Sequence, residues 1–409
     1  MNEIKDVKKE RKFFGLSQNV FMFGFISLLN DLSSEITVRT LPLFLANVLG
    51  VKTSIIGLIE GVADSTATIL KIFSGWFSDK VGKRKPLVVW GYALSSLSKP
   101  LFYFANSWPF VLILRFFDRV GKGIRTSPKD ALIADSTEKE NQGKAFGYSR
   151  AMDPLGAVIG LLIAAVVIAF GSKGIIDMTR SIYQKLVLIA AVPAIISVLL
   201  IIFFIKDYSP SGNKKGLPNL SLKGFDSQFK AFLVIIVVFT LGNSSDAFLI
   251  LRAQQLGLSL FQIFIMLAMF NFVTSIVSIP AGILSDKFGR HRVIIAGWLV
   301  YGLIYLGFAF ANVGWQVWIL YTLYGIYYGA TDGVAKALVA DIVPSEKRGT
   351  AYGLYNAAIG VSALPASFIA GILWQNINPA APFLFGSILS LCAMISMAIL
   401  VRPKKEIRA

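Results

Sequence analysis

Residues 75–85 read Gly-Trp-Phe-Ser-Asp-Lys-Val-Gly-Lys-Arg-Lys, and residues 282–292 read Gly-Ile-Leu-Ser-Asp-Lys-Phe-Gly-Arg-His-Arg. The two segments share glycine, serine, aspartate and lysine at the same relative positions and end in basic residues. A second match follows at nearly the same spacing, because residues 134–147 and 340–353 both begin with Ala-Asp and end with Gly. Two matches at nearly constant spacing predict that the chain is one unit duplicated in parallel.

The composition predicts a membrane protein. The chain has 409 residues, 55% of them hydrophobic, and its mean hydropathy of +0.66 lies outside the range of soluble domains. Apolar runs separated by Gly, Pro, Asn and charges leave room for roughly twelve transmembrane helices. The expected spans are 17–46, 53–78, 87–106, 109–134, 142–170, 181–205, 230–254, 259–285, 291–312, 316–340, 347–375 and 381–401.

One polar segment, between the sixth and seventh spans, is rich in Ser, Pro, Gly, Asn and Lys. Such a composition is typical of a linker. The sequence therefore predicts an all-α membrane protein with an N-terminal six-helix bundle (1–205), a cytoplasmic linker (206–229) and a C-terminal six-helix bundle (230–409). In a parallel duplication of this kind, a substrate site lies between the two halves near the middle of the bilayer.

The positive charge is unevenly placed along the chain. There are 40 Lys and Arg against 23 Asp and Glu, for a formal net charge of +17. The basic groups collect before the first span, after the second and eighth, and at the C-terminus, whereas the alternate connections are nearly uncharged. This asymmetry predicts an integral plasma-membrane protein with both termini in the cytoplasm and the first span as its insertion signal. Because the charge is not on a solvated domain, we expect no nucleic-acid partner.

Catalytic and metal chemistry are disfavoured by composition. Cys392 is the only cysteine and His291 the only histidine, so sites that need several Cys or His ligands are excluded. No Gly-x-x-x-x-Gly-Lys-Ser/Thr motif for ATP binding occurs. We therefore expect no bound metal, no cofactor and no enzyme, and without an appended signalling domain a sensor is also disfavoured.

The repeated loop carries a family resemblance. It resembles the signature loop of the major facilitator superfamily, Gly-x-x-x-Asp-x-x-Gly-Arg/Lys-Arg/Lys. The matching residues are Gly75, Asp79, Gly82, Lys83, Arg84 and Lys85, with a degenerate copy at Gly282, Asp286, Gly289 and Arg290. The resemblance implies two six-helix halves around a central cavity and a small-molecule substrate moved by alternating access. We also expect a monomer. It also implies that these loops act as a gating latch, with Asp79 meeting the start of the eleventh helix and Gly75 permitting close helix approach.

The fourth span carries five basic residues on one face. They occupy roughly one third of the helix circumference, and each would cost about 2.5–3.5 kcal/mol at the bilayer centre. This stripe must therefore face water, other protein or a charged solute. Its members are Arg115, Arg119, Lys122, Arg125 and Lys129.

Acidic residues on neighbouring spans suggest proton coupling. Burial favours the neutral carboxyl and a nearby cation favours the carboxylate, so a movement that separates such a pair binds or releases a proton. The alternative is that these charges form static ion pairs, although buried pairs stabilise proteins poorly. The predicted coupling network is Asp31, Glu35, Glu60, Asp64, Arg115, Asp118 and Asp153.

Other polar residues within the spans are predicted to line the cavity. They are Asn30, Arg39, Lys71, Arg119, Lys122, Arg125, Arg150, Asn243, Asp246, Asn271, Asp332, Lys336 and Asn356. In the less charged second half, Tyr324, Tyr327 and Tyr328 either contact the solute or form an interfacial belt. Arg252, near the end of the seventh span, is expected to snorkel toward the surface.

Two partial motifs bear on mechanism. Arg115 stands where the family has an Arg-x-x-Gln-Gly motif associated with proton coupling, but Asp118 and Arg119 replace its glutamine and glycine. The surplus of cations suggests an anionic or zwitterionic solute, with pairing to the acids as the alternative. Asp153-Pro154 in the fifth span resembles the Gly-Pro motif of antiporters, although close helix packing explains it better.

The sequence thus predicts a secondary transporter that moves a small solute by alternating access with proton coupling, and favours efflux by antiport over import. The alternative is a proton-coupled carrier of an anionic metabolite. A metal cation exporter is less favoured because the predicted cavity holds more cations than carboxylates.

Overall fold

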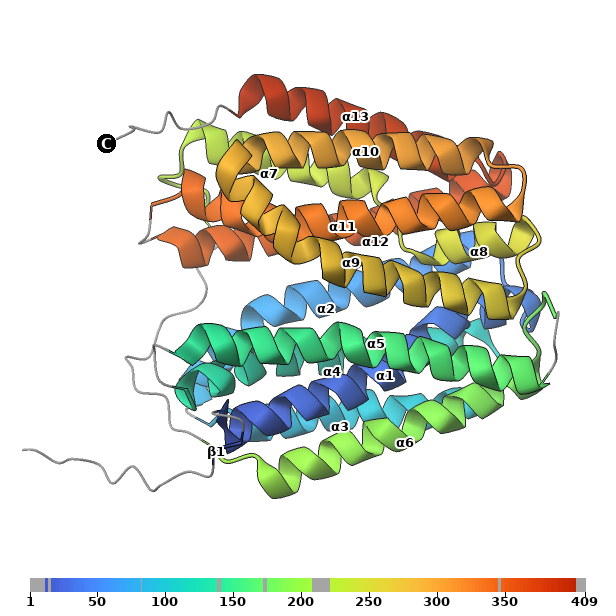
Figure 1. Cartoon of the computed structure of the whole chain (residues 1–409), viewed down its shortest axis with the longest axis horizontal. Coiled ribbons are helices and arrows are strands. Elements are labelled where there is room, and N and C mark those ends of the chain that lie inside the picture. The colour runs from blue at the N-terminus through green and yellow to red at the C-terminus, as the bar shows by residue number, and fades with distance from the viewer. Residues whose placement is uncertain are drawn as a thin grey trace, which may run out of the picture.

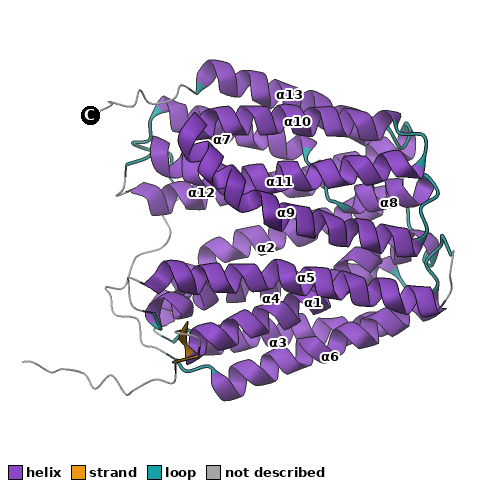
Figure 2. Cartoon of the chain, viewed as in Figure 1, coloured by secondary structure: helices purple, strands orange, loops and turns teal. Residues whose placement is uncertain are grey.

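The computed structural model describes residues 12–13, 16–81, 83–137, 141–171, 175–207, 221–344 and 347–401, without the side chains of Lys12, Phe13, Asp79, Val81, Ile279 and Asp286. Within these ranges the chain consists of helices joined by loops, with one short antiparallel pair of strands, β1 (Lys12–Phe13) and β2 (Leu16–Ser17) (Figure 2). The helices are α1 (Gln18–Asn47), α2 (Thr53–Val81), α3 (Lys85–Leu101), α4 (Trp108–Asp135), α5 (Gln142–Gly171), α6 (Arg180–Phe204), α7 (Ser227–Gly242), α8 (Ala247–Gln255), α9 (Leu260–Phe288), α10 (Arg290–Phe310), α11 (Gly314–Ile342), α12 (Arg348–Asn376) and α13 (Ala381–Leu400).

The helices form two groups that lie side by side. Helices α1–α6 make up one group and α7–α13 the other, as Figure 1 shows. Because α1 begins and α13 ends at the same end of the molecule, we call this end the terminal end and the opposite one the far end (Figure 1). If α7 and α8 are taken as one passage, the described helices cross between these ends twelve times. The predicted fold class is confirmed.

Only some of these helices look like membrane spans by composition. Among the described residues, seven helices are long and apolar enough to cross a membrane: those within 144–170, 180–204, 227–255, 260–278, 290–310, 348–376 and 381–400. The remaining long helices are α1, α2, α3, α4 and α11. These helices carry most of the charged residues predicted for the site. Those charged residues lower the hydropathy of the helices, and they are also the residues that suggest a function.

The seventh span is broken, which the sequence analysis did not foresee. We expected a continuous helix over 230–254, but α7 ends at Gly242 and α8 begins at Ala247. Residues 243–246 read Asn-Ser-Ser-Asp, and these short polar side chains compete with the helix for backbone hydrogen bonds. Non-helical backbone at membrane depth is tolerated where it lies inside protein or along a polar cavity.

The two groups of helices touch most closely where α2 meets α12. A side chain at Gly57 would place its Cβ 2.1 Å from the carbonyl oxygen of Ser367, and one at Gly61 would lie 2.8 Å from that of Leu364. At Gly371 the nearest atom is the carbonyl oxygen of Thr53, at 2.5 Å. Glycine is required at these positions because only it lets two helix backbones approach this closely.

Candidate functional site

The two halves are joined by hydrogen bonds near the far end. The side-chain amides of Asn47 on α1 and Gln254 on α8 bond each other, at 2.7 and 3.2 Å. The Ser54 hydroxyl on α2 donates to Gln375 on α12 at 2.7 Å. Leu260, at the start of α9, donates its backbone N–H to Ile175 at 3.1 Å. Together with the glycine contacts of α2 and α12, these bonds hold the far end shut.

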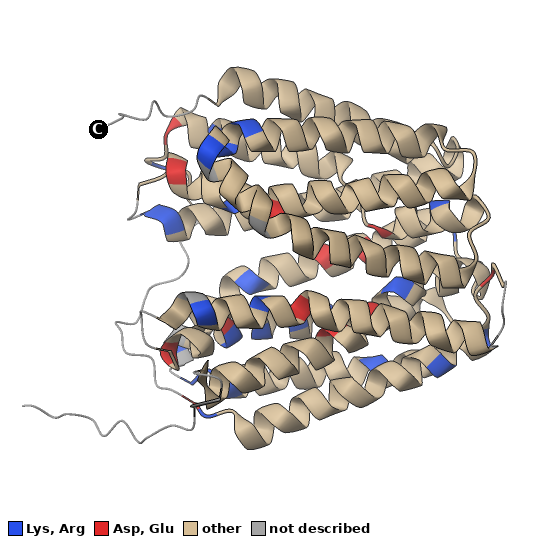
Figure 3. Cartoon of the chain, in the orientation of Figure 1, with Lys and Arg blue, Asp and Glu red and all other residues tan. Residues whose placement is uncertain are grey.

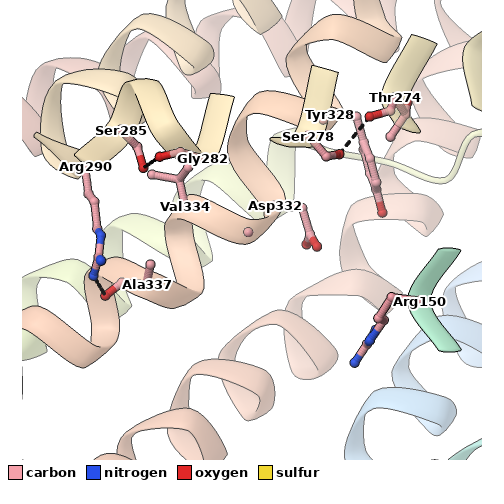
Figure 4. A pocket seen from close by; sticks show the side chains of 12 residues that line it. Arg150, Thr274, Ser278, Gly282, Ser285, Arg290, Tyr328, Asp332, Val334 and Ala337 are labelled. Atoms are coloured by element: carbon pink, nitrogen blue, oxygen red, sulfur yellow. Dashed lines mark hydrogen bonds between the residues drawn. The ribbon is translucent and has the colours of Figure 1, made fainter. Parts of the chain in front are cut away.

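A polar cavity lies between the halves toward the terminal end. Its volume is about 570 Å³. Arg150 of α5 stands on one side and is 66% exposed, whereas Thr274, Ser278 and Asp332 come from α9 and α11 on the other (Figure 4). Asp332 pairs with Lys336 one turn along α11 at 3.0 Å, and both side chains are about half exposed. The cavity therefore offers hydroxyl groups and charges of both signs.

An ion pair crosses between the halves at the break in span seven. The Arg39 guanidinium on α1 donates to Glu35 at 2.9 Å and to Asp246 at 2.8 Å. The other carboxylate oxygen of Asp246 accepts from the Tyr324 hydroxyl at 3.2 Å. The break places Asp246 at the start of α8, so the irregular backbone positions the acid that meets the first half.

Two of the predicted acids are firmly paired. Glu60 and Arg115 are 3% and 2% exposed, and their contact of 2.7 Å joins α2 to α4. Asp118 accepts a hydrogen bond from the Ser95 hydroxyl of α3 and lies 3.6 Å from Arg115 and 3.4 Å from Arg119. These acids stabilise the buried arginines of α4 and are themselves stabilised by them.

Three other predicted acids lack such partners. Asp31 accepts only the side-chain amide of Asn30, at 3.0 Å, and none of the described cations lies within ion-pair distance of it. Within the described part of the chain, the carboxylates of Asp64 and Asp153 have no hydrogen-bond or ion-pair partner. All three are partly accessible to solvent. The structure thus divides the predicted network into paired and unpaired acids.

The basic stripe of α4 meets several kinds of environment. Lys122 is exposed, with Arg119 and Asp31 as its main charged neighbours. The Arg125 guanidinium lies over the Tyr92 ring of α3 at 4.1 Å, a cation–π contact. Lys129 donates to the Ser27 hydroxyl of α1. Figure 3 shows charges along the helices of the first group, whereas those of the second are uncharged over most of their length.

The remaining predicted cavity residues are half-buried. Asn271 donates to the Leu267 carbonyl one turn back in its own helix, and Asn243 accepts from the Tyr301 hydroxyl at 3.3 Å. For the side chains of Lys71 and Asn356 we find no hydrogen bond or ion pair with another described residue. Their part in a binding site stays a prediction.

The second half has an aromatic interior. Tyr324 and Tyr327 are 2% and 5% exposed and stack at 5.7 Å, so the belt interpretation is wrong for these two residues. Tyr328 is 43% exposed and lines the cavity. Most of this cluster was not predicted from the sequence, and its other members include Phe239, Phe270, Tyr301, Tyr305 and Tyr321.

Arg252 does not snorkel. It is 8% exposed, and its guanidinium donates to the backbone carbonyls of Phe308, at 3.3 Å, and Ala311, at 2.8 Å. These carbonyls lie at the end of α10, where the last turn of a helix leaves acceptors unsatisfied and concentrates negative partial charge. The expectation was wrong because another helix end supplied partners inside the protein.

The repeated loops are tied to the fourth helix of each half. Arg84 donates to Asp135 and to the Ala131 carbonyl, and Arg290 donates to Asp341 at 2.7 Å and to the Ala337 carbonyl at 2.9 Å. The structure therefore joins the two motifs that the sequence shows separately. Arg84 is buried, while Lys83 is exposed.

The glycines of these loops differ in their surroundings. A Cβ on Gly75 would lie 3.3 Å from Ser127 of α4, in agreement with a close helix approach, whereas one on Gly282 would meet nothing within 4 Å. Gly289 has a φ of +90°, which favours glycine. Gly82 and the side chains of Asp79 and Asp286 lie outside the described residues, so the latch stays a prediction.

Sequence reasoning missed one buried cation. Lys99 on α3 is 1% exposed, and its ammonium donates to the hydroxyls of Ser33 at 2.9 Å and Ser34 at 3.0 Å. Its signal in the sequence was a lysine well inside an expected span, 87–106. No acid stands one turn away on the same helix to mark it as part of a charged pair.

Within the described part of the chain, twelve helical passages in two halves, with a polar cavity between them, form the architecture of a secondary transporter. The model of the Major Facilitator Superfamily matches residues 23–248 and again residues 231–409. The chain belongs to this superfamily, whose members are transporters and not enzymes, and it is an integral membrane protein.

Similar proteins agree with this family. An MFS-type transporter of Methanocaldococcus jannaschii is 39% identical over 92% of this chain and 93% of its own length. The multi-drug resistance efflux pump PmrA of Streptococcus pneumoniae is 26% identical over 80% of this chain and 82% of the pump. A solved variant of the nucleoside transporter NupG has a TM-score of 0.79 at 11% identity, covering 94% of this chain and all of NupG. At that identity the solved structure supports the fold alone.

Proposed function

We propose that this transporter couples the movement of a small solute to protons, with Asp31 and Asp64 as proton-binding groups. The observation that supports this is the division of the acids. Glu60 and Asp118 are held by arginines, whereas Asp31 and Asp64 have no described cation within ion-pair distance. A carboxylate without a cationic partner inside a membrane protein is the kind of group that binds a proton.

The charge asymmetry favours a cytoplasmic terminal end. The cavity then opens to the cytoplasm and the sealed far end faces outside, which corresponds to the inward-facing state of alternating access. In this state Arg39 and Asp246 bridge the halves at 2.8 Å. We expect this bridge to break when the far end opens. The division into bundles 1–205 and 230–409, the linker 206–229 and the monomeric state stay predictions.

The solute that fits best is a zwitterion or an anion. Lys122 is exposed and can hold a carboxylate or phosphate group. Arg119, 7% exposed, lies one turn before it and reaches its nearest carboxylate only at 3.4 Å, so it can share such a group. Asp31 and Asp64 are available for an ammonium group. The similarity to the pump PmrA favours export over import. A carrier of an anionic metabolite is the second candidate, and it rests on the same two cations.

Reconstituted protein tests the coupling. A thermal-shift screen of organic anions and zwitterions identifies a solute, and flux is then measured in proteoliposomes with and without a proton gradient. Asp31→Asn and Asp64→Asn should lower gradient-driven accumulation, and a coupling free energy of about 1–3 kcal/mol corresponds to about 5–150-fold. Asp226→Asn, at the exposed start of α7 and outside the cavity lining, is the matched control.

Two results would contradict the proposal. Flux that is unchanged when the gradient is collapsed removes proton coupling. Unchanged solute affinity in Arg119→Gln and Lys122→Gln removes the anion-binding role of α4, and leaves the stripe as a structural feature.

A further inference from the structure

Lys99 is a buried charge that the proposed coupling network does not yet use. It lies on α3, which packs against α4 and α6, and its side chain is 1% exposed and reaches α1. Lysine is almost never fully buried unless it is paired with an acid. Here the ammonium contacts only two hydroxyls, those of Ser33 and Ser34, and within the described residues no carboxylate lies within 4.0 Å of it.

The hydroxyl partners are themselves unequal. Ser33 donates its own hydrogen to the Ala190 carbonyl of α6 at 2.5 Å, so its oxygen can only accept from Lys99. For Ser34 we find no acceptor among the described residues, so its hydroxyl is able to turn. When the amine is neutral, its lone pair can accept this hydrogen. The pocket therefore offers the Lys99 nitrogen hydrogen-bond partners in both its charged and its neutral form.

Charged groups approach Lys99 from two of the helices around it. From α1 comes Asp31, one turn before Ser34, and from α4 come Asp118, Arg119 and Arg125. Helix α6 contributes alanine carbonyls along this stretch, through Ser33 and Ser96. Because Asp118 is already held by Ser95 and two arginines, the acid able to receive a proton is Asp31.

We infer that Lys99 is a proton-carrying residue of the transport cycle. The Ser34 hydroxyl, turned toward the Asp31 carboxylate, gives its hydrogen to that carboxylate and takes one proton from the Lys99 ammonium, so Lys99 becomes a neutral amine while Asp31 becomes a carboxylic acid. Proton number and net charge are conserved in this step. Lysine can lose its proton inside a protein, whereas the arginines nearby cannot. This inference rests on the proposed proton coupling and adds a basic group to its acids.

The proton transfer connects a residue that water can reach with a residue buried inside the first half. Asp31 is partly accessible to solvent, whereas Lys99 is sealed within the first half. A proton on Lys99 is held inside the bundle, and a proton on Asp31 can exchange with water. Loss of the buried charge also changes the electrostatics between α1, α3 and α4, and α1 carries Arg39, the residue that bridges to the second half.

The test uses the conformation of the full chain and needs no identified solute. Spin labels are placed at Lys144→Cys on α5 and Arg348→Cys on α12, both exposed near the terminal end, in a Cys392→Ser background. Distances between the labels are measured from acid to alkaline pH in lipid nanodiscs. With lysine at position 99, we expect one distribution of label distances at acid pH and a different one at alkaline pH.

The two Lys99 variants should shift the distances between the labels in opposite directions. Lys99→Arg, a permanent cation, should keep the acid-limit distribution at every pH, and Lys99→Gln, a neutral residue able to bond the serines, should keep the alkaline-limit one. Monodispersity and helical content establish that each variant is folded. If Lys99 only fills space and hydrogen-bonds, Lys99→Arg will titrate like the wild type, and that result overturns the inference.

The same measurement separates the two proposals. If the wild-type background shows no pH dependence, proton coupling itself fails. If both Lys99 variants retain the full pH dependence and Asp31→Asn loses it, the proposed function stands and Lys99 has no part in it. A Lys99→Gln variant that does not fold leaves Lys99→Arg as the deciding variant.

Discussion

The fourth helix of each half occupies the same place in the repeat, yet the two helices have opposite chemistry. The spacing that relates Arg84 to Arg290 and Asp135 to Asp341 also relates Arg115 to Tyr321 and Asp118 to Tyr324. In α4 these positions form ion pairs with Glu60 and with neighbouring arginines. In α11 they are buried tyrosines that pack edge to face at 5.9 Å. The same position in the repeat therefore carries charged residues on α4, which we call the charged wall, and tyrosines on α11, which we call the aromatic wall.

The third helices differ in the same way. The repeat relates Ser95 to Tyr301 and Lys99 to Tyr305. Ser95 donates to Asp118 of α4, whereas Tyr301 packs against Tyr305 at 4.1 Å and contacts Tyr324 of α11. The third helix of each half thus contacts the fourth at matching positions, but through a hydrogen bond in the first half and through aromatic rings in the second. This difference suggests that the first half holds the coupling chemistry and the second half reads the shape of the solute.

The largest expected effect comes from breaking the charged wall. Arg115→Met leaves Glu60 buried without its cation, and removal of one partner of a buried pair costs about 3–5 kcal/mol. We expect a strongly lowered temperature of unfolding in detergent. The double variant Glu60→Met, Arg115→Met should recover much of the loss, because it removes both charges. If Tyr321→Phe, at the matching position of α11, is as damaging as Arg115→Met, the contrast between the walls is wrong.

A smaller effect should distinguish the two copies of the loop contact. Arg84 and Asp135 are 9% and 30% exposed, whereas Arg290 and Asp341 are 28% and 48% exposed. Arg84→Gln should cost about 1.5–3 kcal/mol, as for hydrogen bonds to charged groups, and Arg290→Gln about 0.2–1 kcal/mol, as for exposed pairs. Thermal unfolding of the two variants side by side measures this. Equal losses would mean that burial does not set the difference between the copies.

A third small effect, similar in size to that of Arg290→Gln, is expected at the point where the two walls meet. Tyr324→Phe keeps the aromatic packing but removes the hydroxyl that donates to Asp246 at 3.2 Å. A neutral donor of this kind contributes about 0.5–1.5 kcal/mol. Because Asp246 keeps Arg39, we expect the variant to fold normally and to open its far end more readily. The distances between two spin labels near the far end should show this shift. Unchanged distances would mean that the Tyr324 hydroxyl does not help to keep the far end closed.

The sequence predicted much of the fold because a chain that crosses a bilayer repeatedly must alternate long apolar segments with polar loops. Long apolar runs and basic loops gave the passages, and the repeated Gly-x-x-x-Asp loop gave the duplication. The break at residues 243–246 was missed because a short polar run inside an apolar segment looks like any other set of cavity-facing residues. Whether such a run stays helical depends on the partners that the surrounding helices offer to its backbone.

The candidate site was predicted only as a set of residue types. The helical spacing placed Arg115 and Arg125 on one face, but Arg115 binds Glu60 and Arg125 lies over Tyr92. Periodicity along one helix gives the direction of a side chain and says nothing of its partner on another helix. For the same reason Lys99, with its partners on α1, escaped notice.

By itself the sequence determined the class of protein, because hydropathy, charge asymmetry and the duplicated loop are properties of the chain alone. Tertiary structure decided which acids are paired, where the halves are sealed, and that a lysine is buried against two serines. The physical reason is the cost of placing a charge away from water. That cost depends on the atoms within a few ångströms, and in this chain many of those atoms belong to helices far away in the sequence.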